Sequence, residues 1–100
     1  IVPFAPLETA APAAPLNLAA AAGDAQVALA WNAATNADFS FYSLHRSTTN
    51  GGPYSLIAAN LTATTFTNGF LSNGTRYHYV VTATDWTGLE SAPSNPADAM

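Results

Sequence analysis

This chain of 100 residues is long enough for one domain with a modest core and too short for two. It holds two arginines, no lysine and a net charge of −4, which excludes nucleic acid as a partner and argues against anionic membranes, because both require clustered cations. It also lacks cysteine, so it forms no disulfide and has no thiolate chemistry.

The first thirteen residues are rich in proline and alanine and predict no regular element. Each of Pro3, Pro6 and Pro12 disfavours helix at the residue before it and favours extended backbone. No signal peptide or initiating methionine is present, and no apolar run approaches the ~20 residues of a membrane span. We therefore interpret residues 1–13 as a linker and the chain as a piece of a longer polypeptide.

Beyond this segment the sequence predicts short strands separated by turns. Residues 23–24 and the run TTNGGP at 48–53 are turn signals, because Asn and Gly accept positive φ and proline starts the return strand. Val27, Leu29 and Trp31 alternate with alanines, which places them on one face of a strand. Turn signals recur every ~8 to 12 residues, and no segment predicts a helix. The predicted strands lie at 16–20, 27–31, 42–46, 54–59, 62–67, 77–83 and 91–95.

The last predicted strand, 91–95, is an edge strand that Pro93 and Pro96 cut short. Residues 97–100 are then a tail, and the domain extends from 14 to 96. Seven short strands with regular turn signals indicate an all-β fold, a two-sheet antiparallel sandwich.

The order and spacing of these segments resemble a fibronectin type III domain, over residues 14–96. The resemblance implies a seven-stranded immunoglobulin-like sandwich. The GGPY hairpin and the closing ESAPSN are similar to the bacterial branch, found beside catalytic domains of secreted polysaccharide-degrading enzymes. Two departures are Phe41, where such modules often have glycine, and the loop with Trp86, which lacks Arg-Gly-Asp and so does not imply integrin-type adhesion. The matching segments are PLNL at 15–18, VxLxW at 27–31, YxLxRS at 42–47, GGPY at 51–54, FT at 66–67, LxxGTxYxYxVxA at 71–83 and GxESxPS at 88–94.

The resemblance also implies which residues build the core. Trp31 fills the space between the two sheets. Tyr77 occupies the place of the family's tyrosine corner, in which the ring packs inside and the hydroxyl bonds the backbone of the preceding turn. The predicted core residues are Trp31, Tyr42, Leu71, Tyr77 and Val81.

A candidate interface lies on the face that points away from the core, on the sheet that contains the strands at 42–46 and 77–83. Phe41 and Val80 adjoin core-facing residues, so the period of two sends both outward. The family's fold makes their strands neighbours, which puts them on one surface with His45 and His78, and Trp86 follows directly. We expect a neighbouring domain, the linker or a second copy of the chain to cover this patch. The alternative is that Trp86 closes its loop over the edge of the core.

The sequence predicts no catalytic residue, cofactor or metal site. It has neither a Gly-x-Ser-x-Gly elbow nor a His-Glu-x-x-His helix, and its acidic residues fall in separate turns rather than across a cleft. His45 and His78 lack the further ligands that zinc requires. Asp85 and Glu90 are candidates to share Ca²⁺, but their segment lacks the ligand density of a calcium loop.

The leading hypothesis is a non-catalytic spacer or docking module of a secreted bacterial multidomain protein, a carbohydrate-active enzyme. Its partners are then the neighbouring domains of the same polypeptide. The rival hypothesis is a module that binds a polysaccharide or a protein through loops and exposed aromatic residues. Sugar binding usually requires two or three coplanar aromatic rings, and only Trp86 is a clear candidate. An enzyme is the third hypothesis.

Overall fold

The computed structural model describes residues 12–35 and 39–100. Within these ranges the chain forms strands and turns, without a helix, and so no described helix is long and apolar enough to cross a membrane. Most of the predicted linker, residues 1–11, lies outside the described part. The strands are β1 (Ala19–Gly23), β2 (Gln26–Ala30), β3 (Phe39–Ser47), β4 (Ser55–Leu61), β5 (Thr65–Asn68), β6 (Tyr77–Asp85) and β7 (Ala97–Ala99).

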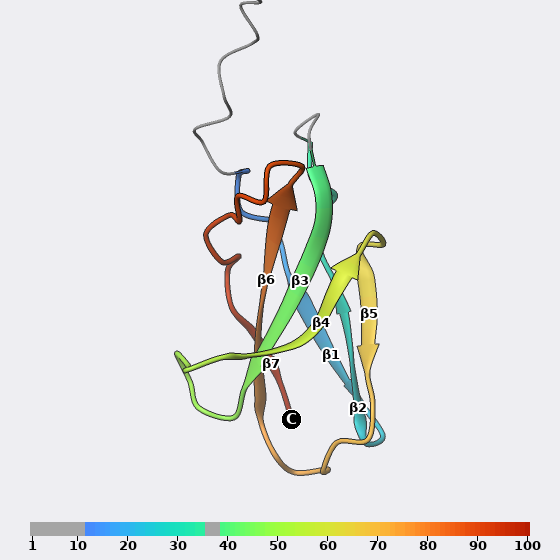
Figure 1. Cartoon of the computed structure of the whole chain (residues 1–100). Helices are drawn as coiled ribbons and strands as arrows, with labels where there is room; N and C mark the ends of the chain where they lie inside the picture. The colour runs from blue at the N-terminus through green and yellow to red at the C-terminus, as the bar shows by residue number, and fades with distance from the viewer. Residues whose placement is uncertain (1–11, 36–38) are drawn as a thin grey trace, which may run out of the picture.

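The strands form two antiparallel sheets that pack face to face. One sheet has the order β1-β2-β5 and the other the order β4-β3-β6-β7 (Figure 1). The two longest strands, β3 and β6, lie side by side in the centre of the second sheet. The predicted all-β sandwich of seven antiparallel strands is confirmed.

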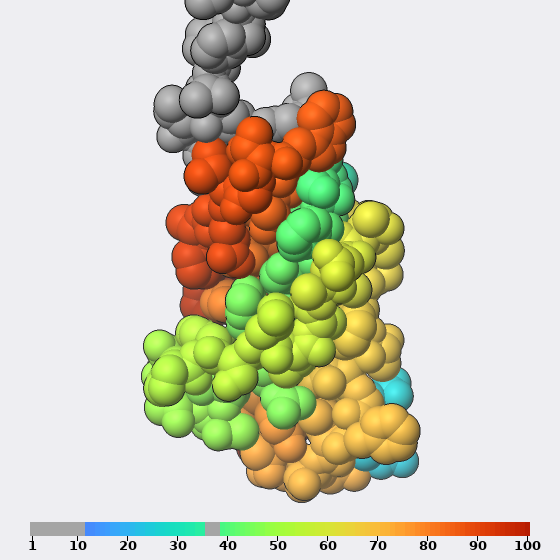
Figure 2. Space-filling model, in the orientation of Figure 1, coloured from blue at the N-terminus to red at the C-terminus, as the bar shows by residue number. Residues whose placement is uncertain are grey.

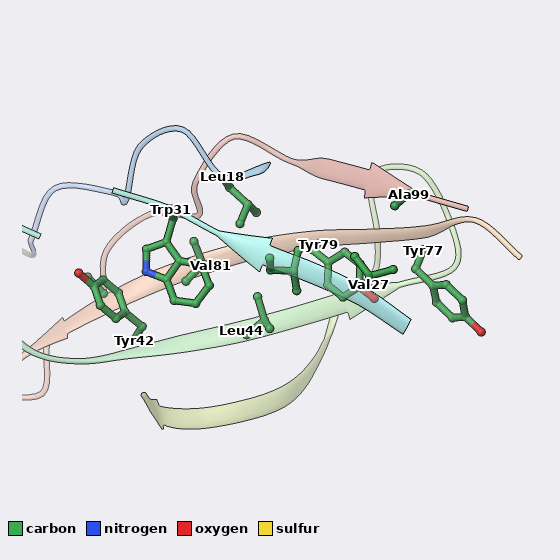
Figure 3. Close-up of a cluster of buried hydrophobic side chains, with 11 residues drawn as sticks. Leu18, Val27, Trp31, Tyr42, Leu44, Tyr77, Tyr79, Val81 and Ala99 are labelled. Carbon is green, nitrogen blue, oxygen red and sulfur yellow. The ribbon is translucent and has the colours of Figure 1, made fainter. Parts of the chain in front are cut away.

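Side chains that alternate inward from β2, β3 and β6 fill the space between the sheets. Trp31 meets the ring of Tyr42 edge to face, with the centroids 5.4 Å apart, and Figure 3 shows this pair at one end of the core and Tyr77 at the other. The structure places Trp31, Tyr42, Tyr77 and Val81 in the buried cluster. Leu71 is partly buried and packs against it.

The predicted tyrosine corner is confirmed at Tyr77. Its hydroxyl oxygen accepts a hydrogen bond of 3.1 Å from the backbone N–H of Ser72, in the turn before β6. The bond fixes the loop between β5 and β6 to the start of β6, and the same loop is joined to the β1–β2 turn by a bond from the N–H of Leu71 to the carbonyl of Ala25.

Tyr79 is the buried ionisable group whose titration depends on folding. Its side chain has no exposed surface, and its hydroxyl donates a hydrogen bond of 2.9 Å to Oδ1 of Asn68. Desolvation by burial raises the pKa of Tyr79 to about 12, against a smaller opposing effect of the nearby Arg46.

We expect the free energy of unfolding to fall between pH ~10 and ~12 because of Tyr79. In this range the unfolded chain loses the phenol proton while the folded chain retains it, so alkali favours unfolding. The chain contains no lysine or cysteine, so few other side chains titrate there. Denaturant unfolding of wild type and Tyr79→Phe at stepped pH checks this. The fall should be smaller in Tyr79→Phe and unchanged in Tyr54→Phe; equal slopes in all three proteins would contradict the assignment.

The last strand lies later in the chain than the sequence predicts. The expected strand at 91–95 is instead an irregular segment, and β7 comes from residues assigned to the tail. Pro93 and Pro96 have no N–H to donate to a ladder. The hydroxyls of Ser91 and Ser94 substitute for backbone acceptors and take hydrogen bonds from the N–H groups of Ala83 and Val81, at 2.9 and 3.0 Å. The domain therefore uses residues beyond 96, and β7 pairs with the first residues of β6.

Candidate functional site

The outer face of the four-stranded sheet carries a shallow hollow of about 240 Å³. Its floor and walls come from β3, β6, the end of the β3–β4 hairpin and the segment after β6. In Figure 2 the segment after β6 (orange-red) lies above the β3–β4 loop (yellow-green), with β3 (green) visible between them. We call this feature the sheet hollow; its main residues are His45, Tyr54, Val80, Thr82, Glu90 and Pro93.

Strand register places the floor of the sheet hollow. His45 on β3 lies directly opposite Val80 on β6, and Thr82 follows two residues later on the same face. After the loop, an isolated bridge between Thr84 and Glu90 brings the chain back alongside β6, so that the side chain of Glu90 shares the outer face with Thr82. The hollow is thus formed by β3, by β6 with the segment about ten residues after it, and by the β3–β4 hairpin loop, which is far from β6 in the sequence.

Three polar groups meet inside the sheet hollow. The hydroxyl of Thr82 donates a hydrogen bond of 2.6 Å to Oε2 of Glu90. Nε2 of His45 lies 3.4 Å from that hydroxyl oxygen and 3.7 Å from the same carboxylate oxygen. A nucleophilic triad requires the acid to orient the imidazole from its far nitrogen, whereas here Glu90 binds the hydroxyl itself. The geometry is therefore that of a polar hydrogen-bonding surface.

The five predicted interface residues do not form one hydrophobic patch. The structure brings His45 and Val80 together, whereas Phe41 lies opposite Thr84 and His78 lies opposite Ser47, each further along the sheet. The side chain of Val80 points away from the core cluster, as the period of two predicts. It is nevertheless only 6 % exposed, and Tyr54 and Pro93 line the hollow beside it.

Trp86 stands at the tip of a loop that Asp85 holds rigidly. Oδ1 of Asp85 accepts hydrogen bonds from the N–H and hydroxyl of Thr87 and from the N–H of Leu89, at 2.9, 2.7 and 3.0 Å. Two backbone bonds, between Asp85 and both Gly88 and Leu89, close the loop. Trp86 nevertheless remains 75 % exposed. The alternative in which it closes over the core edge is therefore wrong.

The side chains of Asp85 and Glu90 point to opposite faces of the four-stranded sheet. Asp85 continues the series of inward residues that includes Ala83, and its side chain is 2 % exposed. Glu90 reaches Thr82 on the outer face. Within residues 12–35 and 39–100, no three His, Asp or Glu side chains converge on a position that could hold a metal ion. The two carboxylates are thus not arranged to share Ca²⁺.

Phe70 is the residue that sequence reasoning missed. It lies in the loop between β5 and β6, its side chain is fully exposed, and its φ of 57° is in the left-handed region. A bulky side chain there is a conformational outlier that costs about 1–2 kcal/mol. Strand periodicity gives no signal in a turn, and the neighbouring Gly69 marks only that a turn exists.

No family model matches this sequence. Over 89 residues it is 40% identical to an amylopullulanase of Thermoanaerobacterium thermosulfurigenes, which covers 89% of this chain and 5% of that protein. Over 87 residues it is 40% identical to a poly(3-hydroxybutyrate) depolymerase of Ralstonia pickettii, which covers 86% of this chain and 16% of that protein. The chain therefore spans a small part of both relatives.

Among solved structures, the chain resembles an Fn3-like protein from Clostridium thermocellum. The TM-score is 0.81 at 39% sequence identity, and the match covers 91% of this chain and 94% of the other. The likeness therefore extends over nearly the whole of both molecules, in sequence as well as in fold.

Proposed function

This chain belongs to the fibronectin type III family, and we propose that it is a non-catalytic spacer and docking module of a longer bacterial enzyme that degrades polysaccharide. The observation that carries the proposal is that the chain matches only a small share of a much longer enzyme. The chain is similar to a stretch that makes up 5% of an amylopullulanase, and a stretch of comparable similarity occurs in a depolymerase of a different polymer. A segment shared by enzymes of different chemistry is suited to a role outside the reaction itself.

The path of the chain supports a spacer. The first described residues lie at one end of the sandwich, and the C-terminus lies towards the other end (Figure 1). β6 has nine residues, so this rigid body separates what is attached at its two ends by about 30 Å. The two sheets pack against each other through the hydrophobic core, and this packing keeps the separation fixed.

Exposed aromatic residues at both ends support a docking role. The loop with Trp86 lies at the end where the described chain begins, and the loop with Phe70 lies at the opposite end (Figure 1). Aromatic side chains dominate protein interfaces, and a strained residue that stays exposed suggests a contact made elsewhere. The partners are then adjoining domains of the same polypeptide, and the setting is the secreted one of polymer-degrading enzymes.

Two substitutions at Phe70 test the docking role. Phe70→Gly relieves the left-handed conformation and should stabilise the isolated chain by about 0.5–1 kcal/mol. Phe70→Ala removes the ring, keeps the strain and should change stability by less than about 0.5 kcal/mol. In the full-length polypeptide both should lower the melting temperature of the adjoining domain. Calorimetry of the isolated and full-length proteins checks this; an adjoining domain unaffected by either change would contradict docking through Phe70.

A further inference from the structure

We propose that the sheet hollow binds one ring of a neutral oligosaccharide. The proposal rests on the proposed function as an accessory module and adds to it a ligand and a site. The sheet hollow joins an apolar surface to a cluster of hydrogen-bonding groups, and its volume of about 240 Å³ is below the ~300–1,000 Å³ of sites for drug-sized ligands. A single sugar ring, which has apolar C–H faces and polar edges, matches both its size and its chemistry.

The apolar part of the sheet hollow supplies a surface for the face of a ring. The rings of Tyr54 and Pro93 line the hollow, and Val80, which is only 6 % exposed, adds a small apolar surface between the polar groups. Tyr54 is partly exposed at the end of the hairpin loop, so a ligand can reach its ring. Aromatic side chains with a polar tip are well suited to such half-polar ligands.

The polar part supplies groups for ring hydroxyls. Oε2 of Glu90 already accepts the hydroxyl hydrogen of Thr82, which orients the carboxylate. In residues 12–35 and 39–100, Oε1 has no hydrogen-bond donor, and the side chain of Glu90 is 50% exposed. A carboxylate held in this way can accept hydrogen bonds from ring hydroxyls, and such charge-assisted bonds are the stronger ones. His45 adds a second polar edge, since its side chain is 22% exposed beside the same oxygen.

Charge selects against acidic sugars. Arg46 is bound to Asn68 and stacks on Tyr77, and Arg76 is paired with Asp98, so both guanidinium groups are engaged away from the sheet hollow. An anionic ring would therefore meet the Glu90 carboxylate without a compensating cation. The sheet hollow favours uncharged sugars over uronic acids or phosphorylated sugars.

Titration of the ¹⁵N-labelled chain with maltotetraose tests the proposal. We expect amide shifts centred on His45, Val80 and Thr82, with a Kd of about 1 mM. Tyr54→Ala and Glu90→Gln should each weaken binding at least about tenfold. Glu90→Gln keeps an oxygen for Thr82 and so preserves the fold, which a melting curve verifies. Trp86→Ala, which removes an exposed aromatic residue outside the sheet hollow, should leave binding unchanged.

Trigalacturonate completes the test. It should not shift the amides of the sheet hollow under conditions where maltotetraose does. Stronger binding of trigalacturonate than of maltotetraose, an absence of shifts with maltotetraose, or shifts that persist in both Tyr54→Ala and Glu90→Gln would overturn the proposal. Each of these outcomes leaves the docking role intact, because that role is tested separately through Phe70 in the full-length polypeptide.

Discussion

Trp31→Ala is expected to lower the free energy of unfolding by about 3–5 kcal/mol, the largest effect of any single substitution proposed for this chain. The side chain is 5% exposed and lies between the sheets against Tyr42. Its removal leaves a cavity that the rigid strands on both sides cannot close. A domain of this size has a total stability of about 5–15 kcal/mol, so the variant should be largely unfolded at moderate denaturant concentrations.

Trp31→Phe separates packing from hydrogen bonding at the same position. Among the described residues, the buried indole N–H of Trp31 has no acceptor. Phenylalanine removes that unpaired donor and keeps most of the apolar volume, so we expect a cost of about 1–2 kcal/mol. Denaturant unfolding of both variants provides the comparison. A cost in Trp31→Phe equal to that in Trp31→Ala would mean that the N–H is essential and that cavity formation is not the cause.

Asp85→Ala should destabilise the chain by about 2–4 kcal/mol, the second largest effect. The substitution removes one oxygen that accepts three hydrogen bonds within the Trp86 loop. Hydrogen bonds to a charged acceptor contribute about 1.5–3 kcal/mol each, but here the freed donors near the surface regain water. Opening of the loop should also increase the mobility of Trp86.

Hydrogen exchange and fluorescence anisotropy test the prediction for Asp85→Ala. In Asp85→Ala the amides of Thr87 and Leu89 should lose protection, and the anisotropy of the fluorescence from Trp86 should fall in a Trp31→Phe background. Glu90→Gln serves as the matched control, since it changes a carboxylate of the same segment on the outer face. Unchanged protection in Asp85→Ala would show that backbone bonds alone hold the loop.

The sequence was sufficient for the fold because the fold depends on patterns of short range. Alternation at Val27, Leu29 and Trp31 specified an inward face, and the resemblance to the fibronectin type III family placed the tyrosine corner at Tyr77. The last strand was misplaced because Ser91 and Ser94 use side-chain oxygens in place of backbone acceptors. Strand propensities do not describe side-chain oxygens that replace backbone acceptors.

The candidate site was harder to predict because it depends on contacts of long range. The period of two correctly predicted that the side chain of Val80 points outward. Whether an outward side chain is exposed depends on which other segments pack around it. Here Tyr54 and Pro93 come from segments on either side of β6 in the sequence. The exposure of Phe70 depends on a left-handed backbone in a turn, where no periodic pattern exists.

The central claim is that this module contributes no chemistry of its own, and an assay of the isolated chain tests it most directly. The purified chain, at high concentration, is incubated with starch, pullulan and poly(3-hydroxybutyrate), and soluble products are quantified against buffer. The account predicts product at the level of buffer alone, for wild type and for Glu90→Gln alike. Product above buffer that disappears in Glu90→Gln or His45→Ala would contradict the account, because it would make the sheet hollow an active site.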